Sequence, residues 1–231
     1  MAKIADLIIS ANQGIEDYLK AEYGDVASTV IAYGTNPVAR DSEIDTTWFD
    51  AQGVKLKDYY LVVGRFVPEN NYEAIIRNFM ASDTTRDLVI ITNHQGNPYF
   101  DKLREITGFE QDKRVKFVGT VYNKKTLTAI RQQAFAYIHG HAVGGTNPGL
   151  LEAMGATDLN LVYDVSFNRN VALDSALFWQ LDNLTALIAQ AEKLETLEID
   201  QLATRARAII AEKYTWERIV TQYERLFLNE N

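Results

Sequence analysis

The sequence predicts a doubly wound α/β fold, in which helices cover both faces of a parallel sheet. Short apolar runs rich in β-branched residues alternate with longer segments of helical period, which is typical of repeated β–α units. Several of these runs are apolar almost throughout, as expected for strands that are buried on both faces of a parallel sheet. The 231 residues are enough for one large domain or two small ones.

The strands are expected where the apolar runs are short and β-branched. The six expected strands are 29–33, 59–64, 87–92, 115–118, 135–139 and 159–163. Between them, apolar residues recur with helical spacing. The expected helices are 12–22, 70–80, 98–106, 124–133, 148–155 and 174–193. From residue 174 onward we expect helices only, which gives the fold a helical C-terminus.

Two segments do not fit the alternation. Residues 36–57 are polar, contain Pro37 and Gly53, and lack sustained periodicity, so we predict a long loop there. The first 25 residues place a strand-like run and a helix ahead of the main alternation. We interpret 1–25 as a connecting segment from a preceding domain, and 26–231 as the domain itself.

The composition excludes several function classes. The chain has no cysteine, which excludes structural disulfides, thiolate zinc sites and thiol catalysis. The net charge of −8 argues against a nucleic-acid-binding surface, although it leaves open a basic pocket for a small phosphate ligand. The sequence has no apolar run of about 18 residues and no signal-peptide pattern at its start, so we expect a cytoplasmic protein without a transmembrane segment.

The stretch HGHAVGGTNPGLLEAMG, residues 139–155, carries the richest chemistry. An expected strand leads into a glycine-rich turn and then into a helix that Pro148 can open. Gly144 and Gly145 allow a ligand to approach the backbone closely, and a helix N-terminus attracts phosphate. A plain strand–turn–helix connection without a ligand would fit the same pattern.

Three polar side chains of that stretch are candidates for ligand contacts. Asn147 could cap the helix, and Thr146 could either donate its hydroxyl to an anion or cap in its place. Glu152 lies about one turn into the helix, where a carboxylate can accept hydrogen bonds from sugar hydroxyls. Alternatively, Glu152 is a solvated helix residue.

His139 and His141 lie two residues apart at the end of the expected strand, so both side chains point to the same side. A metal site would need a third ligand, and the only other histidine is His94. Nothing has ligand spacing around the pair. Hydrogen bonding to a sugar or phosphate is therefore favoured over a metal site.

Three further loops follow expected strands. Arg65 could pair with a phosphate at the end of strand 59–64, or form a surface salt bridge. Asn93 lies in the loop TNHQGNP, and Val118 and Tyr122 belong to FVGTVY, where an aromatic ring could flank a planar base. Because parallel strands end at one edge of a sheet, these loops are expected to meet the glycine-rich turn.

The order of VVGRFVPEN, LVIITNHQG, VKFVGTVYNKKTLTAI, GGTNPGLLEAM and KYTWERIVTQYERLF resembles the retaining family 4 glycosyltransferases. The likeness covers about 25–225 and is to the C-terminal, donor-nucleotide half of a GT-B fold, a Rossmann-like sheet. HGHAVGGTNPGLLEAM and GRFVPENN resemble most the bacterial rhamnosyltransferases of capsular and cell-wall polysaccharides. The first 25 residues resemble the end of the N-terminal domain, and Thr29–Asn36 resembles the first strand of the C-terminal domain.

The resemblance also implies roles for single residues. Arg65 matches the arginine that contacts the donor diphosphate, and we expect it to act in catalysis. Glu152 matches the second glutamate of the family's Glu-x7-Glu motif, which holds the ribose hydroxyls. Residues 145–147 match the turn whose backbone meets the sugar and the phosphate.

The sequence departs from the family pattern at two positions. Gly144 stands where the first glutamate is usual, and Asn70 stands where most members have a lysine. His139 or His141 could supply the lost polar contact. The loss of a carboxylate and a cation is consistent with a donor that has fewer hydroxyls, such as a 6-deoxy sugar.

The resemblance implies transfer of a sugar, with retention, to a saccharide or lipid-linked acceptor. The expected donor is dTDP-rhamnose, with UDP- or GDP-sugars as alternatives, and no metal or organic cofactor is expected. The acceptor would bind through a missing N-terminal domain, so this chain alone should be inactive; the full enzyme could associate with the inner face of the membrane. Two alternatives stay open, namely a stand-alone nucleotide-sugar-binding module and a subunit that pairs with a separate acceptor domain.

Overall fold

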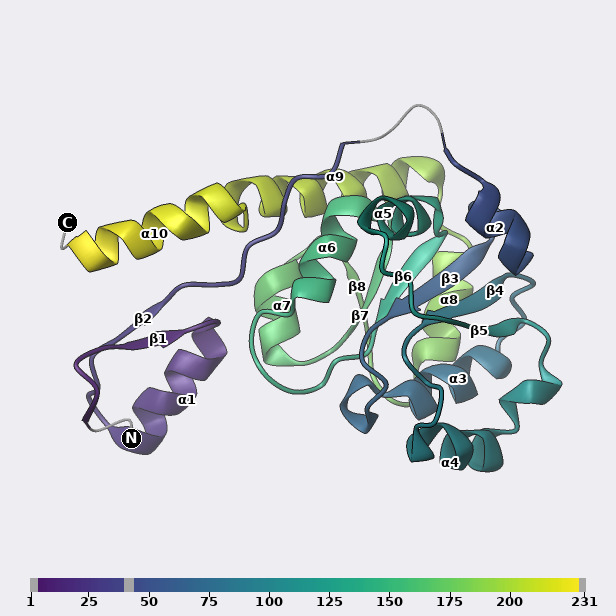
Figure 1. The fold of residues 1–231 in the computed structure, drawn as a ribbon, viewed down its shortest axis with the longest axis horizontal. Helices are drawn as coiled ribbons and strands as arrows, with labels where there is room; N and C mark the ends of the chain where they lie inside the picture. The colour runs from purple at the N-terminus through teal and green to yellow at the C-terminus, as the bar shows by residue number, and fades with distance from the viewer. Residues whose placement is uncertain (1–3, 40–43, 229–231) are drawn as a thin grey trace.

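The protein, as described by a computed structural model of residues 4–39 and 44–228, is built on a six-stranded parallel sheet (Figure 1). The strands are β3 (Tyr59–Val63), β4 (Asp87–Ile91), β5 (Val115–Gly119), β6 (Ala136–His139), β7 (Asn160–Tyr163) and β8 (Leu177–Trp179). Their order is β5-β4-β3-β6-β7-β8, so the chain winds outward from β3 in one direction and from β6 in the other. The predicted doubly wound parallel sheet is confirmed.

Helices cover both faces of this sheet, because the central strands are apolar on both sides. On β3, Tyr60 and Val62 pack against one group of helices, and Tyr59 and Leu61 pack toward the other. The first group is α3 (Tyr72–Met80), α4 (Pro98–Thr107) and α8 (Leu184–Ala191). The second group includes α2 (Thr47–Gln52), α5 (Lys124–Gln133) and α6 (Pro148–Ala156). A further core joins α6 to α7 (Ser166–Ala172) and α9 (Thr196–Lys213).

The predicted helix 174–193 is wrong in its first half. Leu177–Trp179 forms β8, which pairs in parallel with β7, and α8 begins only at Leu184. Trp179 is fully buried in the core between this face of the sheet and its helices. A strand of three residues is too short to show a period of its own, which is why the apolar spacing of this region indicated a helix.

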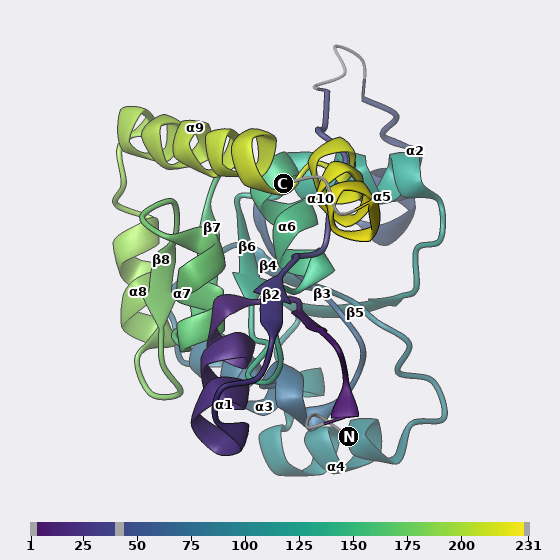
Figure 2. The same cartoon turned by 90° about the vertical axis from the view of Figure 1, so that its left-hand side faces the viewer.

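The predicted strand 29–33 does not belong to the main sheet. Ser28–Val30 forms β2, which pairs in parallel with β1 (Ile8–Ser10), and α1 (Gln13–Tyr23) connects the two strands. Figures 1 and 2 show this β1–α1–β2 unit beside the main sheet. An apolar run shows that a segment forms a strand, but it does not show which sheet the strand joins.

The predicted loop 36–57 contains one helix, so that part of the prediction is wrong. α2 forms within it because Phe49, which is almost fully buried, packs toward Tyr59 of β3. Six helical residues are too few to show a periodic pattern. Residues 40–43 of the predicted loop lie outside the described residues.

The chain ends in two helices, α9 and α10 (Trp216–Leu228), so the predicted helical C-terminus is confirmed. α10 extends toward the end of the molecule where the β1–α1–β2 unit lies (Figure 1). At the junction, the Thr35 amide donates to the Tyr214 carbonyl at 2.6 Å, and the Trp216 amide donates to the Thr35 carbonyl at 3.3 Å. None of the helices within the described residues is long and apolar enough to span a membrane.

Candidate functional site

A cavity of about 410 Å³ opens at the carboxyl ends of β3 and β6, where the direction of winding reverses. Ligands of open α/β sheets bind at such switch points. The cavity is lined by the ends of β3 and β6, the connections that follow these two strands, one side of α5 and the start of α6. They bring together six of the predicted site residues: Arg65, Asn70, His139, His141, Asn147 and Glu152.

Asn70 connects two sides of this cavity. Its Nδ2 donates to the Arg65 carbonyl at 2.7 Å, and its Oδ1 lies 2.8 Å from His141 Nδ1. Since Oδ1 of an amide only accepts, His141 Nδ1 carries the hydrogen of this bond. A Cβ atom on Gly140 would lie 2.2 Å from the Asn70 carbonyl oxygen, so only glycine fits there. The β3–α3 and β6–α6 connections are therefore held in fixed positions.

The two histidines differ in their surroundings. His139 is 4% exposed, and its Nε2 has no hydrogen-bond partner among the described residues. Burial, with a smaller effect from His141, lowers the pKa of His139 from 6.5 to about 3, so its imidazole is neutral near pH 7. Burial and then the charge of Arg65 also lower the pKa of the half-buried His141. The cavity wall therefore offers polar nitrogens with little positive charge of their own.

Glu152 forms an ion pair inside the cavity. Its Oε2 lies 2.6 Å from a terminal nitrogen of Arg131, which belongs to the last turn of α5. The Glu152 side chain is 48% exposed, whereas Arg131 is almost fully buried. Sequence reasoning missed Arg131, because a basic residue in the last turn of a helix usually compensates the helix dipole at the surface.

The fold resembles those of several solved structures, one of which contains UDP and glucose. Anabaena HepE, in a structure with UDP and glucose, has a TM-score of 0.84 and 17% identity over 100% of this chain and 64% of that protein. Sucrose-phosphate synthase from Thermosynechococcus elongatus has a TM-score of 0.81 and 17% identity over 99% of this chain and 59% of that protein. This is the fold of a GT-B glycosyltransferase domain. A glycosyltransferase from Rickettsia africae is also similar, with a TM-score of 0.83 and 11% identity over 98% of this chain and 64% of that protein.

The chain thus spans less than two thirds of the length of these neighbours. Residues 1–36, which include the β1–α1–β2 unit, match a family model described as a domain of unknown function, DUF1972. No curated protein matches the sequence.

The glycine-rich turn between β6 and α6 lies against the β1–α1–β2 unit. The Thr146 hydroxyl donates to the Ala11 carbonyl at 2.5 Å, and a Cβ atom on Gly145 would lie 2.7 Å from Ile15 Cδ1. Gly144 has a φ of +104°, which favours glycine. The hydroxyl hydrogen of Thr146 is therefore used within the protein, and it neither caps α6 nor points to an open anion site.

Asn147 caps α6, as its position predicts, because its Oδ1 accepts from the Gly149 amide at 2.8 Å. Besides Gly144, Gly145 and Thr146 of the glycine-rich turn, three further predicted contacts do not line the cavity. Asn93 and Tyr122 lie on exposed loops, and the Tyr122 side chain is 87% exposed. Val118 packs against the core beside α2 and α5. Their roles toward a nucleobase stay predictions.

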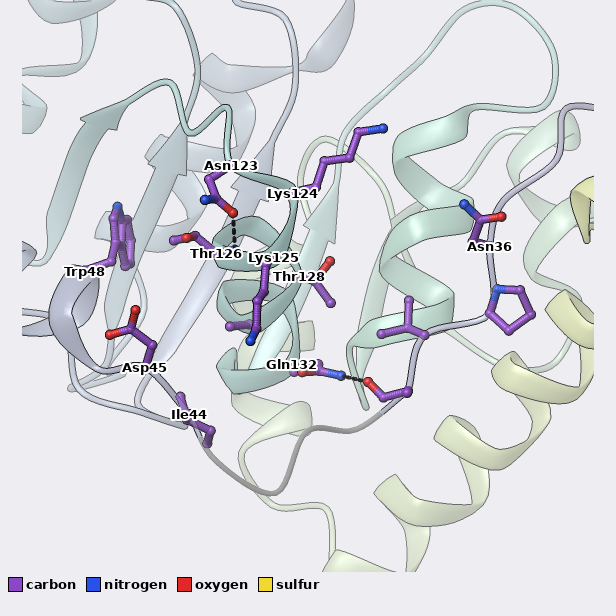
Figure 3. A pocket seen from close by; sticks show the side chains of 14 residues that line it. Asn36, Ile44, Asp45, Trp48, Asn123, Lys124, Lys125, Thr126, Thr128 and Gln132 are labelled. Carbon is purple, nitrogen blue, oxygen red and sulfur yellow. Dashed lines mark hydrogen bonds between the residues drawn. The ribbon is translucent and has the colours of Figure 1, made fainter.

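A second cavity, of about 520 Å³, lies between the segment before α2 and the outer side of α5 (Figure 3). In Figure 3, Trp48, Asp45 and Ile44 lie on one side of α5 and Asn36 on the other. None of the predicted site residues lines this cavity. Within the described residues, the buried polar atoms without partners that border a cavity, Arg131 Nε and His139 Nε2, belong to the smaller one. We therefore regard the smaller cavity as the candidate site.

Within the described parts of the chain, no three His, Asp or Glu side chains converge. His139 and His141 have ring centroids 6.3 Å apart, and His141 already uses Nδ1 toward Asn70. The chemistry that the site offers is hydrogen bonding and charge: two guanidinium groups, two imidazoles and a carboxylate around one cavity.

Proposed function

We propose that this chain is the donor-binding part of a glycosyltransferase and that the 410 Å³ cavity holds a nucleotide-diphosphate sugar. The observation that carries the proposal is that Arg65, the two histidines and Glu152 line one cavity at the switch point of the sheet. A diphosphate needs a cation, and sugar hydroxyls need polar acceptors. The similar fold of HepE, solved with UDP-glucose, supports this assignment.

Arg65 is proposed to stabilise the leaving group. It is exposed at the end of β3, and none of the described carboxylates forms an ion pair with it. As the bond between the sugar and the diphosphate breaks, negative charge grows on the diphosphate oxygens, and a guanidinium beside them stabilises that charge. Asn70 is uncharged and already bonded to Arg65 and His141, so it supplies no second cation.

Glu152 is proposed to accept hydrogen bonds from the ribose. Its half-exposed carboxylate borders the cavity from the first turns of α6. The donor proposed from the resemblance is dTDP-rhamnose, with UDP- and GDP-sugars as alternatives. Gly144 brings no carboxylate to the sugar, which suits a 6-deoxy sugar with one hydroxyl fewer. Arg65 can do the work of a cation, so the proposal includes no metal or organic cofactor.

The acceptor side is proposed to come from a second α/β domain that covers the β1–α1–β2 unit. A two-stranded parallel sheet is marginal by itself, since parallel sheets are normally buried on both faces and extended by further strands. α10 adds exposed apolar side chains at the same end, including Val220 and Phe227. The solved neighbours are longer than this chain, which supports a further domain.

The remaining parts of the proposal rest on the sequence resemblance. Transfer retains the anomeric configuration, the acceptor is a saccharide or a lipid-linked sugar of capsule or cell-wall synthesis, and the complete enzyme works in the cytoplasm at the inner face of the membrane. Residues 26–231 bind the donor, and this chain alone binds donor nucleotide without transferring sugar.

Isothermal calorimetry of the chain with UDP, dTDP and GDP, with and without Mg²⁺, tests the proposal. We expect at least one nucleotide to bind without a magnesium requirement. Arg65→Ala should weaken binding by about tenfold or more, as expected when a charged hydrogen-bond partner is lost. Arg205→Ala is the matched control, because Arg205 is an exposed arginine of α9 that pairs with Asp174 away from the cavity. No heat with any nucleotide at millimolar concentration would refute the proposal.

A further inference from the structure

We infer that Arg131 is a positioning residue for Glu152. Because of this pair, the cavity binds nucleotides with and without a 2′-hydroxyl with similar affinity, so that deoxyribose donors are accepted. The inference rests on the proposed function, in which Glu152 faces the sugar of the nucleotide. It assigns a role to a buried arginine that neither the sequence pattern nor the leaving-group chemistry uses.

Arg131 is fixed between α5 and α6. Its terminal nitrogen lies 2.6 Å from Glu152 Oε2, and its carbonyl accepts from the Thr157 hydroxyl at 3.0 Å. Glu152 lies in the middle of α6 and Thr157 is its C-cap residue, so Arg131 contacts this helix at two places. The pair is therefore part of the packing between two helices and not a mobile surface contact.

Burial makes the pair persistent. The Arg131 side chain is 6% exposed, and its Nε has no hydrogen-bond partner among the described residues. A buried guanidinium that lost its carboxylate would be an unpaired charge in a poorly hydrated place. The nearby Tyr137 hydroxyl donates to the Val63 carbonyl at 3.0 Å, so it does not compete for the carboxylate. Oε2 of Glu152 therefore stays with Arg131 when a ligand arrives.

The engaged oxygen limits what Glu152 can offer a sugar. A ribose presents neighbouring 2′- and 3′-hydroxyls, which a carboxylate accepts best with one hydroxyl on each oxygen. Oε2 keeps a second acceptor site beside its bond to Arg131, but the cation draws electron density from that oxygen and makes it the weaker acceptor. Oε1 is then the stronger acceptor for one hydroxyl, and a 3′-hydroxyl satisfies it. A 2′-hydroxyl would lose water without gaining a full-strength acceptor, so it adds no affinity.

The test compares nucleotides that differ only in the 2′-hydroxyl: UDP with dUDP, and GDP with dGDP. Calorimetry should give the wild-type protein a ratio of Kd values within about threefold for the pair whose base it binds. In Arg131→Met, Oε2 becomes free, and the ribonucleotide should gain about tenfold over the deoxynucleotide, as expected for one added hydrogen bond to a charged group. Arg131→Lys, which keeps the cation, should retain the wild-type ratio.

Arg207→Met is the control, because Arg207 lies on α9 and pairs with Asp158, and neither residue lines the cavity. A purely structural role of Arg131 would weaken both members of a nucleotide pair equally and leave their ratio unchanged, which would overturn the inference while the proposed function stands. If Arg131→Met fails to fold, the ratio of Kd values measured in Arg131→Lys tests the inference instead. A tenfold ribonucleotide preference in Arg131→Lys would contradict the inference. If no nucleotide binds the wild-type protein, the proposed function fails, and this inference fails with it.

Discussion

Removal of Glu152 should destabilise the protein more than removal of its partner. Glu152→Ala leaves Arg131, which is 5% exposed, as a buried cation without its carboxylate. Breaking a fully buried pair costs about 3–5 kcal/mol, and we reduce this to about 2 kcal/mol because water reaches the half-exposed end of the pair. For a chain of this size, the midpoint of thermal unfolding should fall by about 4–8 °C.

Arg131→Met should cost less than about 1 kcal/mol, because the Glu152 carboxylate that it leaves is half exposed and can be hydrated. The double variant should recover most of the stability that Glu152→Ala loses. The measurement is thermal unfolding followed by circular dichroism at pH 7. Glu73→Ala is the control, since Glu73 forms an exposed pair with Arg77 whose loss should cost less than about 0.5 kcal/mol. The reasoning is refuted if Glu152→Ala melts within 1 °C of the wild type, or if the double variant is no more stable than Glu152→Ala.

Three further predictions concern packing, pH and the nucleobase. Gly34→Ala places a Cβ atom 2.7 Å from the Trp216 ring, so it should lower the free energy of unfolding in a denaturant melt by about 1–3 kcal/mol. In Gly53→Ala the added Cβ atom meets no other atom, so this variant tests backbone strain alone. His139 has a pKa of about 3 in the folded protein and 6.5 in the unfolded chain, so the unfolded chain takes up a proton first as the pH falls below 6.5. The free energy of unfolding should therefore decrease by roughly 2 kcal/mol between pH 7 and pH 5. Thermal melts of His139→Gln at these two pH values should lack that part of the decrease. Tyr122→Ala should leave the melting temperature unchanged, because the ring is 87% exposed, and a calorimetric loss of nucleotide affinity of about 1–3 kcal/mol would show that the ring stacks on the base.

The main sheet was predictable because its central strands are buried on both faces. All five residues of β3 are apolar or aromatic, and each side packs against helices, so one run of sequence marks the strand. β8 and α2 were not predictable, since three and six residues are too few to show a period. Their structure depends on packing partners such as β7, which lie far away in the sequence.

The site was predictable only as far as topology determines it. Arg65 and His141 follow strands, and parallel strands bring such residues to one edge, where the cavity lies. Arg131 reaches the same cavity from the end of a helix, and no local pattern distinguishes it from a surface arginine. Thr146 shows the opposite case, because a glycine-rich turn suggests a ligand site whether its side chains face a ligand or another part of the protein.

The contact between Thr146 and Ala11 has a mechanical consequence. The chain connects the β1–α1–β2 unit to the main sheet near Thr35, and that crossing is hydrogen-bonded to the end of α9 beside it. Because these two attachments lie side by side, they would by themselves leave a rigid unit free to rotate about that point. The glycine-rich turn contacts the unit at Ala11 and Ile15, and Asn12 Nδ2 donates to the Phe167 carbonyl at 3.5 Å. These contacts hold the β1–α1–β2 unit at a second place. Any rotation of the unit must therefore first separate the β1–α1 turn from the loop that borders the cavity.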